Sequence, residues 1–471
     1  MSTLDPNFVR AFRNGTLSDE QAAAFAQREP ALVQLDLLAL SAAVAHTTSP
    51  HAPSSTRAPF EKTTPNNNRR NKRGAKPGHT GHSRPEPERI DRRVEHQLPH
   101  CPDCGGELKR TGRTRIRIIE DIPANLKAEA TQHTIHRDWC PCCKKQVEPK
   151  VPDAMPHCTL GNQAVTLSAF LHYGVGTTTK QVVDVFNAHL QLPISEGGLT
   201  QMWHRFAQSL KPWYEQIWKE CFDAAVLNAD ETGWHLNGVL VWLWCFCTPS
   251  ETFYAIEPSR GHATLEKFFT EEFGGVLVTD FWQAYDAVDA RMNQKCWAHL
   301  LRELKAVEDH PNGSRDDWLE FAKPLRRIFT DAVRLNAAEN MPDSERASKV
   351  CRLDTRLTEL ACATWVHPDA ARLSNRLLKN RMSLLTFAEF PHVPATNNAA
   401  ERDIRPAVVM RKMSYGSTSE QGGVTRAILM SIYRTLKKRG LDPLTETRTA
   451  LETLAKTGTL PPLPTKNTSQ R

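Results

Sequence analysis

The pattern of apolar and polar residues becomes strand-like about halfway along this chain. Short runs rich in Val, Leu, Trp and Phe, separated by turn residues, predict strands at residues 225–230, 239–247 and 252–256. A helix is expected at 264–273, and a fourth strand at 275–279. The sequence therefore predicts a sheet interrupted by a single helix.

The order of these elements indicates a fold class. Three strands that form a meander, followed by a crossover helix and another strand, are typical of a ribonuclease-H-like fold. In that fold the crossover makes the fourth strand parallel to the first. We therefore expect a multidomain α/β protein whose catalytic core is ribonuclease-H-like.

Helical periodicity dominates on both sides of this core. An Ala-rich helical segment is expected near 19–45, and three helices lie between 161 and 210, with breaks at 174–176 and 192–195. Their last two members could form a DNA-reading helix-turn-helix or simply pack together.

A second helical stretch, charged and periodic, runs from 309 to 391. Candidate helices at 318–335, 344–362 and 369–390 make it a helical insertion in the core.

Two acids end predicted strands of the core. Asp230 follows VLNA and Asp280 follows VLVT, where a buried carboxylate is costly unless a cation neutralises it. Neighbouring parallel strands are about 4.8 Å apart, so both acids could converge on the same metal ions. A solvent-facing or helix-capping carboxylate is the alternative for each. Glu231 and Asp286 are nearby acids whose side chains should point elsewhere.

A third acid, Glu401, lies in the first turns of a predicted helix that Asn397 or Asn398 could cap. The residues alone favour an ordinary exposed glutamate with salt bridges. Cations that could hold phosphates follow it, namely Arg402, Arg405, Arg411 and Lys412.

The twelve cysteines include two close pairs upstream of the core. Cys101 with Cys104, and Cys140 with Cys143, have the spacing of two zinc knuckles that hold a structural Zn²⁺ ion. Cys142 could replace Cys143, as could His100 or His157. A redox or merely buried set of cysteines is the alternative.

Another pair, Cys296 and His299, has CxxH spacing without a second half to complete a zinc site. We expect these two residues to support the active site.

Charge is concentrated before the cysteines. The net charge of +7 favours a polyanionic partner, and the Pro- and Asn-rich stretch at 47–87 contains, between Asn66 and Arg84, closely spaced cations without acids among them. A basic linker that binds phosphates and a merely solvated linker fit equally well. The linker cations are Arg69, Arg70, Lys72, Arg73 and Lys76.

No secretion signal or membrane span is expected, since the longest apolar run is too short to cross a bilayer. The cysteine usage suggests a cytoplasmic protein.

Six motifs in one order make the chain resemble the insertion-sequence-66 family of bacterial transposases, from about Lys72 to about Leu454. They are KPGHTGHSR, CPDC, NADETGWH, VTDFWQAYD, CWAHLLREL and NNAAERDIRPAVVMRKMSYGSTSEQGG. The amino end departs from the family, because it carries an Ala-rich stretch in place of leucine-spaced coiled-coil helices.

The resemblance implies a ribonuclease-H-like core with an Asp, Asp, Glu triad at Asp230, Asp280 and Glu401, preceded by a zinc-binding segment. It implies a DNA transposase that cleaves element ends and joins 3′-hydroxyls to target DNA with two Mg²⁺ or Mn²⁺ ions. The expected partners are the element's terminal repeats and target DNA, accessory proteins of the same element, and further copies of the chain on DNA. The protein would then be nucleoid-associated while bound.

Two other functions compete with this one. An inactive, zinc-containing DNA-binding regulator would keep the fold without turnover. A tyrosine recombinase would use the HxxR pattern of His299 and Arg302 with Tyr433 as nucleophile.

The expected divisions of the chain follow from these observations. They are a helical segment (1–50), a basic linker (51–99), a zinc-binding domain (100–158), a helix-turn-helix-like domain (159–212), the core's first part (213–303), the helical insertion (304–391), the core's second part (392–435) and a C-terminal helix and tail (436–471).

Overall fold

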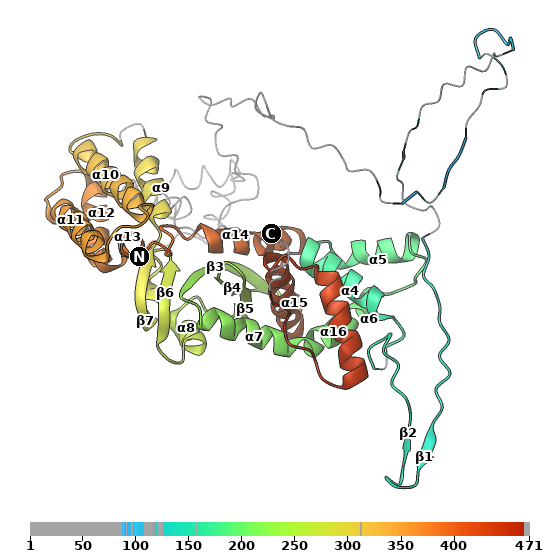
Figure 1. Cartoon of the computed structure of the whole chain (residues 1–471). Helices are drawn as coiled ribbons and strands as arrows, with labels where there is room; N and C mark the ends of the chain where they lie inside the picture. Colours follow the sequence, from blue (N-terminus) through green and yellow to red (C-terminus); the bar gives the residue numbers. More distant parts are fainter. Residues whose placement is uncertain are drawn as a thin grey trace, which may run out of the picture.

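The computed structural model describes residues 126–156, 158–310 and 313–465, together with scattered residues between Pro87 and Ile119 (Figure 1). Some expectations lie outside the described residues. They are the helix at 19–45, Cys101, His157 and the linker cations Arg69, Arg70, Lys72, Arg73 and Lys76.

The central element is a five-stranded mixed sheet in the order β5-β4-β3-β6-β7. The first three strands form the predicted antiparallel meander, and β6 is parallel to β3, as the crossover required. β7 then adds in parallel to β6. The strands are β3 (Val226–Leu236), β4 (Val239–Cys247), β5 (Thr252–Glu257), β6 (Phe273–Thr279) and β7 (Ala290–Lys295).

Strand β3 is longer than the sequence predicted, because it continues past Asp230 to Leu236. Leu236 pairs directly with Val239, so Asn237 and Gly238 form a two-residue turn. Both turn residues have positive φ, 49° and 77°, as tight hairpin turns between twisted strands require. The crossover helix α8 (His262–Phe268) is shorter than predicted, since Phe273 already begins β6.

Three helices cover the sheet. Helix α15 (Glu420–Lys438) packs along β5 beside α7 (Lys211–Phe222), and α14 (Asn398–Ser414) crosses β3 and β4 (Figure 1). Helix α14 thereby brings a segment from late in the chain onto the strand that carries Asp230.

The three helices predicted between 161 and 210 are present. They are α4 (Asn162–Ala169), which continues as a π-helical turn at Phe170–Val175, then α5 (Thr179–Ala188) and α6 (Glu196–Ser209). Their buried faces belong to the same hydrophobic core as the sheet, and α16 (Pro443–Thr457) packs on α4. These helices therefore pack together and against the sheet, as one of the two alternatives expected.

The insertion packs around a second hydrophobic core that includes Trp318, Phe321 and Leu357. The predicted helix at 369–390 is broken after Lys379. The break occurs because the backbone there bonds to side chains of other elements: the Leu384 carbonyl accepts from the Trp297 indole, and the Phe387 amide donates to the Gln294 side chain. The insertion follows α9 (Trp297–Glu308) and contains α10 (Trp318–Asn336), α11 (Asp343–Cys362), α12 (Pro368–Lys379), a 3-10 turn at Arg381–Ser383 and α13 (Thr386–Glu389).

No helix in the described part of the chain is both long enough and apolar enough to cross a membrane.

Candidate active site

Asp230 and Asp280 lie where the sheet opens between two parallel strands. The pairing of β3 with β6 ends at Asn228 and Val278, two residues before each acid. Asp230 continues along β3, whereas the chain leaves the sheet at Asp280. The Oδ1 atom of Asp230 accepts from the Glu231 amide at 3.0 Å, and that of Asp280 accepts from the Trp282 amide at 2.8 Å. The opening thus presents two carboxylates from adjacent strands.

The charges of the other two predicted acids, Asp280 and Glu401, act on Asp230. Burial raises the pKa of Asp230 well above its usual range, and the charges of Glu231, Asp280 and Glu401 raise it further. Within the described residues no Lys or Arg forms an ion pair with Asp230 or Asp280. Two neighbouring aspartates without a cationic partner among the described residues fit a divalent metal ion with oxygen ligands.

Glu401 approaches this cluster from the first turn of α14. Its Oε1 atom lies 2.6 Å from Nη2 of Arg302 and 3.8 Å from Nε2 of His299. Potential ligand atoms of Cys296, His299 and Glu401 all lie within 4.8 Å of one another. The CxxH pair therefore lies beside the third predicted acid.

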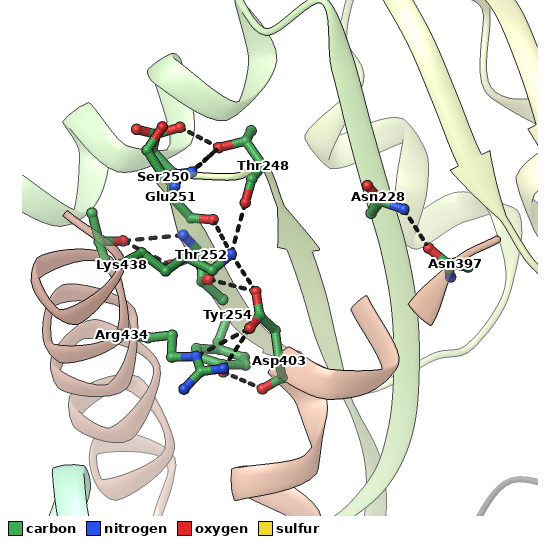
Figure 2. A network of polar contacts seen from close by, with 11 residues as sticks. Asn228, Thr248, Ser250, Glu251, Thr252, Tyr254, Asn397, Asp403, Arg434 and Lys438 are labelled. Atoms are coloured by element: carbon green, nitrogen blue, oxygen red, sulfur yellow. Dashed lines mark hydrogen bonds and ion pairs between the residues drawn. The ribbon is translucent and has the colours of Figure 1, made fainter. Parts of the chain in front are cut away.

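Asn397 precedes this helix, and its role differs from the expected cap. Its side chain makes no capping hydrogen bond. Instead, Nδ2 donates to the Ala229 carbonyl at 2.7 Å, and Oδ1 accepts from Nδ2 of Asn228 at 2.9 Å (Figure 2). The sequence signal was the pair of asparagines before Glu401, but local spacing could not reveal a partner 169 residues away.

Glu231, as expected, is turned away from Asp230 toward a separate cluster. It forms an ion pair with Arg260 at 2.7 Å and accepts from the Tyr285 hydroxyl. Burial, followed by the charge of Asp280, raises the pKa of Glu231 to about 7, although Arg260 opposes this shift. The Arg260 guanidinium lies over two tryptophan rings, 4.9 Å from the centroid of Trp242 and 3.9 Å from that of Trp282. The sequence analysis missed Arg260, which binds the Glu231 carboxylate, and Trp282, whose amide donates to the Asp280 carboxylate.

Asp286, the other nearby acid, also points elsewhere. It is bound by Lys295 at 2.9 Å and Lys379 at 3.2 Å.

The cations of α14 divide into two groups. Arg402, Arg405 and Lys412 are exposed. Arg411 is buried, and its guanidinium donates to Oγ1 of Thr232 at 3.0 Å and to the Gly233 carbonyl. The expectation that Arg411 contacts phosphate is corrected, because its donors bind β3.

Tyr433 does not suit the recombinase alternative. Its side chain is 2% exposed, its hydroxyl has no hydrogen-bond partner among the described residues, and burial raises its pKa well above the usual range. A nucleophilic tyrosine must reach DNA and lose its proton, and this one packs edge-on against Phe170 in the core.

The cysteine-bearing segment contains a short hairpin, β1 (Asp138–Cys140) and β2 (Lys145–Val147). The amide of Cys143 donates to Sγ of Cys140 at 3.3 Å, and this contact is the leading cause of the lowered pKa of Cys140. A turn whose amides stabilise a thiolate is suited to metal binding. Cys104, Cys142 and Cys143 are exposed, so either member of the last pair could serve as a ligand.

The class of protein that these features define is a transposase with a zinc finger before its transposase domain. Family models support both parts: residues 157–425 match "Transposase IS66 family", and residues 99–144 match "zinc-finger binding domain of transposase IS66". The chain belongs to the IS66 family of transposases, which confirms the resemblance.

Curated relatives come from Sinorhizobium fredii (strain NBRC 101917 / NGR234). The uncharacterized protein y4jD is 25% identical over 399 residues, which cover 75% of this chain and 74% of the relative. The uncharacterized protein y4jO is 37% identical over 147 residues, or 31% of this chain and 44% of the relative. Their names assign no activity.

Proposed function

We propose that the chain is a DNA transposase that cleaves element ends and joins the released 3′-hydroxyls to target DNA. The observation that carries the proposal is that the charges of Asp280 and Glu401 raise the pKa of buried Asp230, in a chain of a transposase family. Two of these acids have no cationic partner in the described part of the chain. The strand order, with β3 between an antiparallel and a parallel neighbour, supports a ribonuclease-H-like core.

Asp230, Asp280 and Glu401 would hold two Mg²⁺ or Mn²⁺ ions, since carboxylate oxygens are the ligands that such ions prefer. When bound, such ions activate a water or hydroxyl nucleophile and stabilise the leaving oxygen of an in-line phosphoryl transfer. Asp230 supplies negative charge from a rigid strand, and its partial burial keeps bulk water from screening it.

Glu401 is paired with Arg302, whose side chain is 48% exposed and can rotate toward solvent. Displacement of this arginine would free the Glu401 carboxylate for a metal ion. Arg302 could then bind a DNA phosphate instead, since guanidinium groups recognise both anions.

Two groups of cations would hold DNA, one on helix α14 and one in the basic linker. Arg402, Arg405 and Lys412 stand exposed on the helix that carries Glu401. The linker cations and a Zn²⁺ ion held by Cys101, Cys104, Cys140 and Cys143 would position the element ends, since phosphate contacts set register. Accessory proteins and further copies of the chain would complete the complex on DNA, inside the cell at the nucleoid.

The test is nicking of a supercoiled plasmid that carries the ends of the element encoding this chain, in Mg²⁺ or Mn²⁺. Asp230→Asn should lower the nicking rate at least about a hundredfold, because metal ions contribute several kcal/mol to such reactions. Asp289→Asn is the matched control, since Asp289 is an exposed acid on the connection between β6 and β7. Equal activity of both variants would refute the proposal, and tight end binding without metal-dependent nicking by the native chain would support the inactive regulator.

A further inference from the structure

We propose that Asn397 and Cys296 form a junction that fixes the three acids relative to one another, with both acting as positioning residues. The inference rests on the proposed function, since it assigns the acids a common task. Asn397 is 1% exposed and Cys296 is fully buried. Neither side chain needs to touch DNA or metal for this role.

The junction holds β3 at the residue before Asp230. β3 loses its pairing with β6 after Asn228, so the Ala229 carbonyl has no strand partner on that side. The Asn397 side chain replaces the missing strand, because its Nδ2 donates to this carbonyl at 2.7 Å. Its Oδ1 accepts from Asn228, so both ends of the amide are bound to β3 (Figure 2).

The junction also reaches the residue before Asp280. The amide of Cys296 donates to the Thr279 carbonyl at 2.8 Å. The sulfur of Cys296 accepts from the amide of Asn397 at 3.1 Å. Cys296 therefore joins the end of β6 to the start of α14, which gives the first residue of the CxxH motif a structural task.

The third acid is tied to the same point by the helix itself. The amide of Glu401 donates to the Asn397 carbonyl at 3.2 Å. Each acid-bearing segment is thus bonded at or next to its acid: Ala229 before Asp230, Thr279 before Asp280, and Glu401 directly.

A second anchor holds α14 on the other side of Glu401. Asp403 is buried, accepts from Oγ1 of Thr252 at 2.9 Å and from Nη2 of Arg434 at 2.7 Å, and pairs with Lys438 (Figure 2). With Asn397 bound to β3 and Asp403 bound to β5 and α15, the helix cannot slide along the sheet. Arg411, near the other end of α14, is also bonded to β3, at Thr232 and Gly233, whereas the bonds of Asn397 lie directly before Asp230.

The inference predicts a specific defect when the amide is removed. Asn397→Ala leaves α14 attached through Asp403 and Arg411 but removes the side-chain bonds from the start of the helix to Asn228 and Ala229. Residues that orient metal ligands typically change metal affinity or activity by about 10- to 100-fold when they are replaced. We expect the Mg²⁺ concentration for half-maximal nicking to rise by about that factor, with affinity for element-end DNA unchanged. Asn398→Ala is the matched control, because Asn398 is the exposed neighbour on the same helix.

The experiment measures the Mg²⁺ dependence of plasmid nicking, the melting temperature and DNA affinity for the native chain, both asparagine variants and Asp230→Asn. A lower melting temperature with an unchanged Mg²⁺ midpoint would show that Asn397 only stabilises the fold, and would overturn the junction. If Asp230→Asn also nicks normally, the proposed function has failed as well, which distinguishes the two failures. Should Asn397→Ala not fold, Cys296→Ala removes only the sulfur acceptor, and it must raise the midpoint too.

Discussion

The free energy of unfolding of the metal-free protein depends on pH through Asp230 and Glu231. Their pKa values are raised in the folded state, that of Glu231 to about 7 from 4.5. The folded state therefore holds protons that the unfolded state has released, and the free energy of unfolding falls as pH rises from about 4 to about 7. Above about pH 7 the Glu231 carboxyl has released its proton in both states, so its contribution to this pH dependence ends.

We predict that Mg²⁺ raises the melting temperature more at about pH 8 than at about pH 5, because protons no longer compete for the acids. A ligand at a hundredfold excess over its Kd stabilises a protein by about 2.7 kcal/mol, and this sets the scale at the higher pH. Thermal unfolding with and without Mg²⁺ checks the prediction, and Asp230→Asn should lose most of the difference. An equal shift at both pH values would contradict it.

At this scale the sequence predicted some residues and not others. Asp230 and Asp280 could be found because each ends an apolar strand run, a local pattern. Glu401 could not, since a glutamate in a first helical turn is ordinary, and the family resemblance selected it. Arg411 was misassigned because sequence spacing does not show which face of α14 is buried, and the strand behind it accepts its hydrogen bonds.

Helix α14 presents an exposed row of cations next to the acidic centre. Arg402, Arg405 and Lys412 lie within about 15 Å along the helix axis, which suits several successive phosphates. We predict that Arg405→Gln weakens DNA binding and lowers the slope of log affinity against log salt by about 1, since one phosphate contact is lost.

Fluorescence anisotropy of element-end DNA at several salt concentrations measures this slope. Arg334→Gln is the control, because Arg334 is an exposed cation on α10, where it pairs with Asp331 of the same helix. An unchanged slope in Arg405→Gln would show that α14 is not part of the DNA-binding surface.

Elements were predicted well where their hydrophobic period was long and unbroken. The crossover that makes β6 parallel to β3 followed from element order alone. The boundaries that were wrong have tertiary causes: β3 is extended by its hairpin partner, and the helix expected at 369–390 is broken where its backbone binds Gln294.

Across the whole molecule, the zinc-binding segment and the core have separate sources of stability. The core has extensive hydrophobic clusters, whereas the hairpin of β1 and β2 is largely exposed. We predict one Zn²⁺ per chain, lost in Cys140→Ser, with weakened binding to element ends and an unchanged melting transition of the core.

Metal analysis and calorimetry test this together, with Cys351→Ser as the control from an exposed position in the insertion. Retention of zinc in Cys140→Ser would show that the knuckles do not hold the ion.

The helices at 159–212 illustrate what sequence reasoning could not supply at this scale. Their periodicity predicted three helices, but only the structure shows that they share a hydrophobic core with the sheet. Which buried faces meet depends on contacts between residues far apart in sequence, such as the hydrogen bond between His204 on α6 and Thr425 on α15.

The most direct test of the account is metal-dependent nicking by Glu401→Gln on a supercoiled plasmid carrying the element ends. Glutamine keeps the size of the side chain but removes the negative charge that raises the pKa of Asp230. The account predicts that the native chain nicks in Mg²⁺ and that the variant is slower by at least about a hundredfold while binding the ends equally well. Nicking by the variant at the native rate would contradict the assignment of the third acid and, with it, the proposed centre.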